Sequence, residues 1–237
     1  MPTGTAITRR VRTRRWAIYH PSSFVSSFVI NNACPWLDTR GALHVALAAH
    51  AMSAPEPPCP QRYPARLTNV LPPDEASDLL CLVQRAATSA ARNETTETFA
   101  GETLGLTNGV SGYVYHTIPV VLHAWFCHLQ TGAGLRTALQ NVIRCGGDTD
   151  TTAAILGGII GAGVGRAGLP ADLLDGLAEW PRTVAWMERL AARLAAVVET
   201  GIPQPPLALF VPGVAARNVL FLLVVLAHGL RRLAPPY

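Results

Sequence analysis

Residues 145–155, with the sequence CGGDTDTTAAI, constrain the chain most, because they join a Gly-Gly pair to an acidic and hydroxyl-rich helix start. Glycine permits a sharp backbone turn, and Asp148 or Thr149 can cap the helix that follows. Acidic residues are also favoured near the N-terminus of a helix, where they interact with its dipole. Since an apolar, glycine-spaced run comes next, we predict a helix over residues 149–164.

The same turn carries oxygen ligands that suit a hard cation. Asp148 and Asp150 lie two residues apart, and Asp148 and Thr151 share one face of a first helical turn. Carboxylate and hydroxyl oxygens suit Mg²⁺, Ca²⁺ or Mn²⁺ rather than zinc. We therefore predict a metal site made of Asp148, Asp150 and Thr151. The alternative is that these residues only cap the helix, which is the ordinary role of Asp and Thr at such a position.

The predicted helix and its end contain glycines four residues apart, at Gly157, Gly161 and Gly165, which places them on one face. Each glycine in a helix interior costs about 1 kcal/mol relative to alanine. We expect a neighbouring helix to pack closely against this bare face and to compensate that cost. A membrane helix with small residues four apart fits less well, because the segment starts with acidic residues and its apolar length is short.

The string GGDTDTTAAILGGIIGAGVG resembles the metal-binding signature of the ADP-ribosylglycohydrolase family, which includes the dinitrogenase-reductase activating glycohydrolases. The resemblance extends from about Gly109 to about Leu190. It implies an all-α fold, a compact orthogonal multi-helix bundle. It also implies hydrolysis of an N- or O-glycosidic bond to ADP-ribose, with two Mg²⁺ ions that hold the ribose hydroxyls and orient water. Asp148, Asp150 and Thr151 match the C-terminal half of that metal site.

A second element also resembles the family. The string GVSGYV at residues 109–114, followed by Thr-Ile-Pro at residues 117–119, is similar to a Gly-Tyr-Val plus Thr-Val-Pro element that lies close to ADP-ribose in the family. Glycine permits close backbone approach, and amides at a helix N-terminus favour phosphate oxygens. The alternative is a simple capped helix start. By this resemblance, the substrate-binding residues are Gly109, Ser111, Gly112, Tyr113 and, in the acidic turn, Gly147.

Three other family features are missing from the chain. They are an opening Gly-x-x-x-Gly-Asp-Ala-x-Gly segment, an acidic catalytic residue on a nearby loop and a Thr-Asp-Asp triplet. Two dications need several anionic ligands, so we expect one Mg²⁺ at most and assign no catalytic residue. The expected function is a Mg-dependent hydrolase that removes ADP-ribose from a modified protein or small molecule, impaired by the missing N-terminal half-site. The alternative is a non-catalytic ADP-ribose-binding or structural remnant of the same fold.

The composition favours a compact helical domain and argues against several other classes of protein. Of the 237 residues, 49% are hydrophobic and 14% charged, which suits a compact helical domain. The net charge of +4 comes from an arginine cluster near the N-terminus, so a general nucleic-acid surface is not expected. The five cysteines form no C-x-x-C pair and indicate reduced thiols rather than a zinc site or a disulfide framework. We predict a cytoplasmic monomer.

Three segments are expected along the chain. Residues 1–37 hold the arginine cluster and no acidic residue, and we predict a poorly ordered basic leader. A transit peptide, an arm for anionic surfaces and a misplaced start of the reading frame stay open. Residues 38–200 are predicted to form the truncated ADP-ribosylglycohydrolase-like helical domain. Residues 201–237 are predicted to form a Pro-rich linker and an apolar helix over about residues 215–233.

The apolar run of that last helix, residues 219–227, is shorter than the ~20 residues of a membrane span. We therefore expect the helix to pack on the body of the protein and predict no membrane span, while contact with a membrane surface or a second helix stays open. The apolar periodicity elsewhere predicts loops over residues 55–73 and 93–108. It predicts further helices over residues 41–52, 74–92, 135–144, 172–180 and 181–199, and a long helix that residues 109–114 open.

Overall fold

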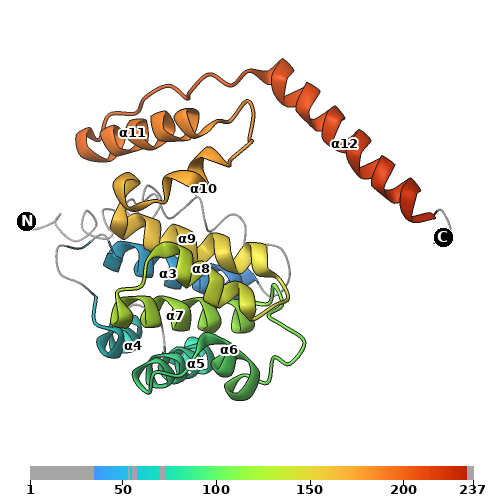
Figure 1. The fold of residues 1–237 in the computed structure, drawn as a ribbon. Helices are drawn as coiled ribbons and strands as arrows, with labels where there is room; N and C mark the ends of the chain where they lie inside the picture. Colours follow the sequence, from blue (N-terminus) through green and yellow to red (C-terminus); the bar gives the residue numbers. More distant parts are fainter. Residues whose placement is uncertain (1–34, 53, 55–57, 70–72, 234–237) are drawn as a thin grey trace, which may run out of the picture. The chain divides into compact units, whose positions relative to one another are not determined.

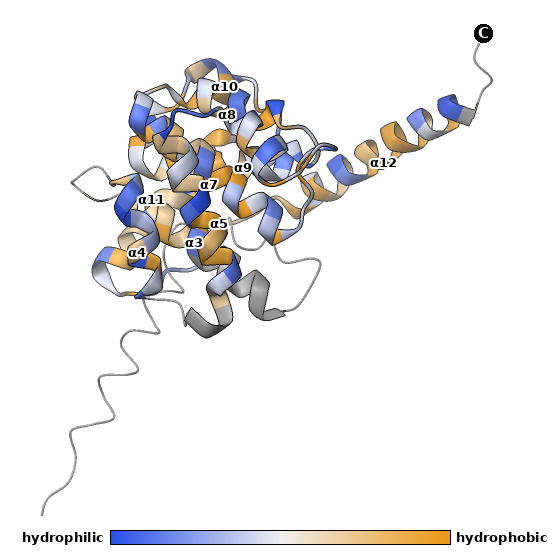
Figure 2. Cartoon of the chain, turned by 90° about the horizontal axis from the view of Figure 1, so that it is seen from below, coloured by the Kyte–Doolittle hydropathy of each residue, from blue (hydrophilic) through white to orange (hydrophobic). Residues whose placement is uncertain are grey.

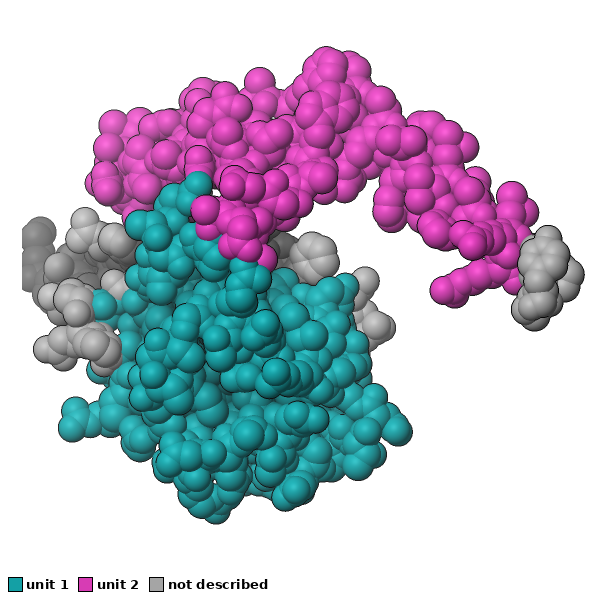
Figure 3. Space-filling model, in the orientation of Figure 1, with its two compact units in different colours: residues 1–170 teal, residues 171–237 magenta. Residues whose placement is uncertain are grey.

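The computed structural model describes residues 35–52, 54, 58–69 and 73–233 (Figure 1). Most of the predicted leader, residues 1–34, lies outside the described residues. The chain divides into two compact units, residues 1–170 and residues 171–237, which are coloured separately in Figure 3. This division falls inside the segment 38–200, for which the sequence analysis predicts one domain.

The first unit is built from helices, and none of its described residues belongs to a β-strand. This confirms the predicted all-α class. Among the described residues of this unit, three short helical segments are not α-helical: η1 (Pro60–Arg62) and η3 (Arg166–Gly168) are 3₁₀ turns, and η2 (Phe99–Thr103) is a π-helix. The α-helices are α3 (Pro35–Met52), α4 (Tyr63–Thr68), α5 (Pro73–Ala91), α6 (Thr96–Thr98), α7 (Val114–Thr131), α8 (Leu135–Arg144) and α9 (Thr149–Val164).

Helix α7 is the centre of this unit. It packs against α5 on one side and against α3 and α9 on the other (Figure 1). Every side chain of α7 from Thr117 to Phe126 is buried, which explains why its sequence is apolar on all sides. Tyr63 of α4 packs edge-on against two of these residues, with ring centroids 5.0 Å from Trp125 and 5.7 Å from Phe126.

The predicted helix boundaries are closest to the observed ones around the acidic turn. Helices α8 and α9 cover the predicted residues, and α5 is shifted by one residue from its prediction. Helix α3 begins at Pro35, six residues earlier than predicted. The two predicted loops are wrong in part, because α4 lies in the first and α6 with η2 in the second. Tyr63 and Leu67, four residues apart and both buried, give α4 an apolar face within the Pro-rich segment.

The prediction of close packing against Gly157, Gly161 and Gly165 is wrong. A methyl group at Gly157 or Gly161 would meet a leucine side chain 3.9 Å away, which is an ordinary contact, and one at Gly165 would meet nothing within 4 Å. The tight approach is at Gly163, where an added Cβ would lie 2.9 Å from the carbonyl oxygen of Met52. The reason is that α3 ends against a different face of α9 from the one that carries the three regularly spaced glycines.

The second unit consists of α10 (Ala171–Asp175), α11 (Val184–Thr200) and α12 (Val211–Leu233). The predicted helix over residues 172–180 ends early, at Asp175. Helix α11 starts at a capping residue, Thr183, whose hydroxyl accepts a hydrogen bond from the Trp186 amide at 3.3 Å. It ends at Gly201, which has the left-handed backbone that closes many helices.

Two expectations concern helix α12. Each of the eight consecutive apolar side chains from Val219 to Leu226 is between 47% and 63% exposed, so the other helices of the second unit do not cover them. That this helix packs on the body of the protein stays a prediction. Figure 2 shows how strongly hydrophobic the middle of the helix is. The apolar run 219–227 is part of a longer helix, and Val211–Arg232, with 22 residues, is long and apolar enough to cross a membrane by length and composition.

Candidate functional site

The acidic turn is joined to the segment that precedes α7. Val110 and Gly147 form an isolated parallel bridge. The Val110 amide donates to the carbonyl oxygen of Gly146 at 3.1 Å, and the Asp148 amide donates to the carbonyl oxygen of Val110 at 2.6 Å. The two segments in which the sequence analysis finds its site residues are therefore held side by side, although about forty residues separate them along the chain.

Two glycines make this junction possible. Gly109 and Gly147 have φ values of +90° and +76°, in the left-handed region that glycine adopts without strain. An added Cβ at Gly109 would lie 2.5 Å from the Gly147 nitrogen, and one at Gly147 would lie 2.1 Å from the Val110 oxygen. Both positions therefore need glycine for the close approach of two backbones. Their predicted contact with a substrate stays a prediction.

The Asp148 side chain is not used as a helix cap. Asp148 is the N-cap residue of α9, but its carboxylate makes no capping hydrogen bond within the described chain. The side chain instead faces the other segment, since an added Cβ at Gly112 would lie 3.0 Å from Asp148 Oδ2. This observation argues against the alternative in which the acidic residues serve only to cap the helix.

The two carboxyl groups of the turn are neighbours. A hydrogen bond with the Asp148 carboxyl, followed by one from the Thr151 amide, lowers the pKa of Asp150 below its ordinary value. The Thr151 amide lies 3.0 Å from Asp150 Oδ1. Two neighbouring carboxyls, of which Asp148 is half-buried and Asp150 exposed, favour the binding of a cation.

The two threonines that follow have different roles. Thr152 is buried, and its hydroxyl donates toward the carbonyl oxygens of Asp148 at 3.0 Å and Thr149 at 3.2 Å. It therefore stabilises the first turn of α9 from the core side. Thr151 is only half-buried, so of the two it is the one that can offer a hydroxyl to a ligand.

The other segment presents an aromatic surface. Tyr113 is 42% exposed, and its ring centroid lies 5.4 Å from that of Tyr115 and 5.3 Å from that of His116. Ser111 holds this arrangement, because its hydroxyl lies 2.9 Å from His116 Nδ1 and accepts from the Tyr113 amide at 3.3 Å. The sequence analysis does not select Tyr115 or His116 as site residues. The signal that identifies them is their spacing, which places all three rings around the first turn of α7.

The donor set fits one hard cation better than two. No group of three or more His, Cys, Asp or Glu side chains within the described residues is arranged to hold a metal ion. Asp148 and Asp150 supply carboxylates, and Thr151 supplies a hydroxyl. Mg²⁺ is often bound through one or two carboxylates while it keeps several waters, so these residues fit a single, weakly held ion.

A model of the ADP-ribosylglycohydrolase family matches residues 25–203, which include both joined segments. The chain belongs to the ADP-ribosylglycohydrolase family. No curated protein and no solved structure matches it. Membership confirms the resemblance found in the acidic turn, and the all-helical first unit agrees with the family's fold. The matched residues cross the division between the two units and end before α12, so the family assignment says nothing about that helix.

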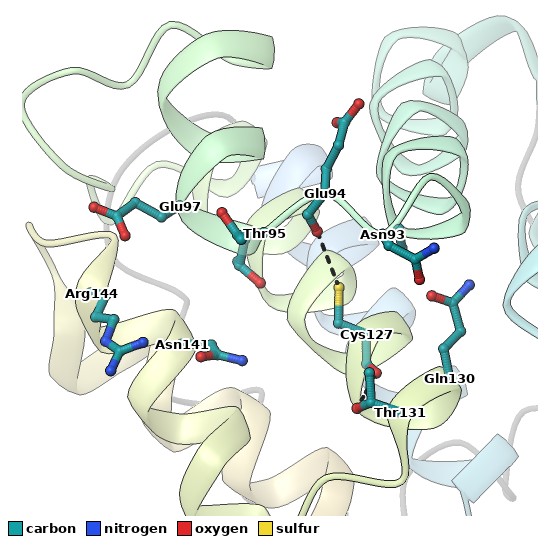
Figure 4. A pocket seen from close by; sticks show the side chains of 11 residues that line it. Asn93, Glu94, Thr95, Glu97, Cys127, Gln130, Thr131, Asn141 and Arg144 are labelled. Atoms are coloured by element: carbon teal, nitrogen blue, oxygen red, sulfur yellow. Dashed lines mark hydrogen bonds between the residues drawn. The ribbon is translucent and has the colours of Figure 1, made fainter.

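A cavity of about 220 Å³ lies elsewhere in the first unit, and none of the predicted site residues lines it (Figure 4). It opens between the α5–α6 connection, the C-terminal end of α7 and helix α8. Burial raises the pKa of the Cys127 thiol in its wall, so this group is a weak nucleophile. The cavity is lined by Ala90, Asn93, Glu94, Thr95, Thr96, Glu97, Cys127, Gln130, Thr131, Asn141 and Arg144.

A buried polar network lies beside this cavity. His123 Nε2 is 3.1 Å from Ser89 Oγ, and His123 Nδ1 is 3.2 Å from Thr96 Oγ1. Phe99 stacks on the imidazole, with ring centroids 4.5 Å apart and an interplanar angle of 9°. Ser89 donates to the Glu94 carboxylate and is itself fully buried.

This network has the residue types of a hydrolytic triad but not its geometry. In a triad the carboxylate orients the histidine and the serine is open to substrate. Here the serine lies between the carboxylate and the histidine, and it is closed to solvent. Burial lowers the pKa of His123 to about 4, so the imidazole is neutral at pH 7. The network therefore stabilises the packing of α5, α6 and α7.

Proposed function

We propose that the junction between the two segments binds an ADP-ribosyl group together with one Mg²⁺ ion. The observation that supports this most is the Asp148 carboxylate, which is unused by the helix and faces Gly112 of the other segment. A carboxylate at a helix start that makes no capping hydrogen bond, and that lies beside a second carboxyl, can serve as a cation ligand.

Each part of the junction has a role in this proposal. Asp148, Asp150 and Thr151 hold the ion through two carboxylates and a hydroxyl. Gly112 has no side chain, so a ribose can approach the Asp148 carboxylate closely. The exposed ring of Tyr113 offers a face on which a nucleotide base can stack. When bound, Mg²⁺ would supply charge stabilisation to the ribose hydroxyls and to a nearby water.

The reaction in question is hydrolysis at the anomeric carbon of ADP-ribose. The oxygen of water forms a bond to that carbon, the C–N or C–O bond to the modified group breaks, and the leaving group takes up a proton. A positioned acid or base is needed for efficient proton transfer. Asp148 and Asp150 are already committed to the ion, so we expect the chain to bind ADP-ribose and to turn over ADP-ribosylated substrates slowly or not at all.

A second function, non-catalytic binding of ADP-ribose, is favoured by the ligand count. With two carboxylates and no cluster of three ligand side chains among the described residues, the site holds too little negative charge for two dications. In this reading the junction recognises ADP-ribose without hydrolysing the bond to its carrier.

Calorimetry with ADP-ribose and MgCl₂ tests the binding proposal. The wild-type chain is expected to bind ADP-ribose more tightly with Mg²⁺ than with EDTA. The double variant Asp148→Asn and Asp150→Asn is expected to lose this difference. Asp78→Asn, which removes an exposed carboxylate from α5, serves as the matched control and should behave as the wild type. Equal affinity of all three proteins with and without Mg²⁺ would sink the proposal.

Release of ADP-ribose from peptides ADP-ribosylated on arginine or on serine separates the two functions. Slow release that stops in Asp148→Asn supports the impaired hydrolase. Binding without any release, at enzyme concentrations equal to those of the substrate, supports the recognition module. Fast release that survives in Asp148→Asn would contradict both, because the chemistry would then lie at another site.

A further inference from the structure

Helix α12, which lies beyond the residues that match the family, exposes an apolar surface. Its large apolar side chains from Val219 to Leu226 are all exposed, and Leu230 is 68% exposed. Only 6% of its most apolar 18-residue window is buried. In Figure 2 the middle of the helix is uniformly hydrophobic and its C-terminal end is hydrophilic. An exposed apolar surface of this extent on a helix indicates an interaction.

The polar residues of α12 are basic or neutral, and they cluster. From Val211 to Leu233 the helix has no acidic residue. At about 100° per residue, its four basic side chains fall within an arc of about 100°: Arg217, His228, Arg231 and Arg232. The opposite side of the helix carries four leucines: Leu222, Leu223, Leu226 and Leu230.

The start of α12 is fixed within its own unit. Arg217 forms an ion pair with Glu179 at 2.7 Å. Gly213 is buried where an added Cβ would lie 2.4 Å from the Phe210 ring and 2.7 Å from the Trp180 ring. A helix that crossed a membrane over its whole length would carry Arg217 into the hydrocarbon and would break this ion pair.

The part of α12 beyond Arg217 is too short to span a membrane. Residues 218–230 are thirteen residues, which at ~1.5 Å per residue measure about 20 Å, whereas the hydrocarbon core of a bilayer is about 30 Å thick. Arg231 and Arg232 follow at once, and they favour the level of the lipid headgroups. Both ends of the apolar run therefore belong at the same membrane surface.

We propose that α12 binds the surface of an anionic lipid bilayer and lies in its plane. The leucine side enters the boundary between headgroups and acyl chains, and the arginines contact anionic headgroups. A bilayer fits better than a protein surface, because apolar residues such as Phe221 and Val224 also lie between the basic residues, so a single protein face would leave part of them in water. This inference does not depend on the proposed function of the first unit.

Flotation of the full chain with lipid vesicles tests the proposal. The wild-type chain is expected to float with vesicles of phosphatidylcholine and phosphatidylglycerol, and much less with vesicles of phosphatidylcholine alone. Replacing Leu223 by glutamate should lower the partition coefficient about tenfold or more, because a fully buried leucine contributes that much. The matched control is Ile202→Glu, at an apolar residue that is 65% exposed and lies outside α12, and it should float as the wild type does.

A second variant probes the charge. The double replacement Arg231→Gln and Arg232→Gln should lower binding to anionic vesicles about fivefold for each arginine removed, and should leave binding to neutral vesicles unchanged. Circular dichroism confirms that each variant keeps its helix content. The proposal is overturned if the wild-type chain stays in the bottom fraction of the gradient, away from the floating vesicles, with both lipid mixtures. It is also overturned if Leu223→Glu floats normally, or if light scattering reveals a dimer that Leu223→Glu dissociates while vesicle binding is absent.

Discussion

Two polar clusters of the first unit differ in how their groups are satisfied. In the buried network, the hydroxyls of Ser89 and Thr96 bond both nitrogens of His123, and Phe99 covers the ring. In the acidic turn, the Asp148 carboxylate caps no amide of the described chain and faces a neighbouring carboxyl and a glycine. The difference teaches that a Ser, a His and a carboxylate in contact do not make a site, whereas polar groups left open to a ligand can.

The comparison predicts separate effects. Changes in the buried network should lower the free energy of unfolding and leave ligand binding intact. Changes to the carboxylates should remove ligand binding and leave the free energy of unfolding intact. The junction at Gly147 should show both effects, because it positions the carboxylates and joins the start of α9 to the segment before α7.

The largest loss is expected at that junction. Gly147→Ala should lower the free energy of unfolding by about 3 kcal/mol or more, because the new Cβ meets the Val110 oxygen and the backbone is left-handed. The matched control is Gly146→Ala, which has a similar φ of +70° but whose Cβ would lie 3.8 Å from its nearest neighbour. Gly146→Ala should lower the free energy of unfolding by about 1 kcal/mol. Urea titration measures both, and equal losses would mean that the two backbones can move apart.

Acid should destabilise the core before it affects the turn. Burial lowers the pKa of His123 and of His44 from 6.5 to about 4, so each binds a proton more readily in the unfolded chain. The free energy of unfolding should therefore be at its full value above pH 6.5 and fall as the pH drops towards 4, by up to about 3 kcal/mol for each histidine.

Urea titrations at pH 7, 5.5 and 4.5 measure this dependence. The variant His123→Gln should flatten part of the slope between pH 6.5 and 4, while Asp150→Asn should leave the slope in that window unchanged. A slope that His123→Gln does not alter would show that the imidazole is reached by solvent in the folded chain, which would break the comparison.

A smaller loss is expected from the hydroxyl of the network. Ser89→Ala should lower the free energy of unfolding by about 1–2 kcal/mol, because it leaves His123 Nε2 buried without its partner. The control Thr88→Ala removes the neighbouring exposed hydroxyl, which donates to the carbonyl oxygen of Gln84. This variant should change the free energy of unfolding by less than about 0.5 kcal/mol. Mg-dependent binding of ADP-ribose should be the same in both variants. Its loss in Ser89→Ala would link the network to the site.

The smallest effect on stability is expected at the exposed carboxyl. Asp150→Asn should leave the melting temperature of the ligand-free chain unchanged, because this side chain is open to solvent and carries negative charge beside Asp148. The rise in melting temperature on addition of ADP-ribose and MgCl₂ should disappear. A marked loss of stability without ligand would mean that Asp150 serves the fold.

Local sequence signals predicted the parts of the fold that local signals determine. From the Gly-Gly pair and the apolar run, the sequence analysis predicted the limits that α9 has in the structure, Thr149 and Val164. The family resemblance selected both segments of the junction, although nothing in the local pattern indicates that Val110 and Gly147 pair. That pairing depends on two left-handed glycines that meet only after α7 and α9 have packed.

Contacts between distant segments were missed for the same reason. The tight glycine is Gly163 and not one of the three evenly spaced glycines, because the direction of α3 decides which face of α9 is covered. The ring of His123 gains its partners from α5 and α6, and its spacing within α7 gives no hint of them. The sequence likewise does not indicate how far α12 is covered within its own unit, since an apolar run has the same pattern whether protein or solvent surrounds it.

The short bond from the Asp148 amide to the Val110 carbonyl has a kinetic consequence. Because one peptide group holds the start of α9 to the approach of α7, that amide can exchange its hydrogen for deuterium only when the two helices separate. Binding of a ligand to the neighbouring carboxylates would then slow this separation. Deuterium uptake at a single position would in that way report on the ligand and on the integrity of the helical core together.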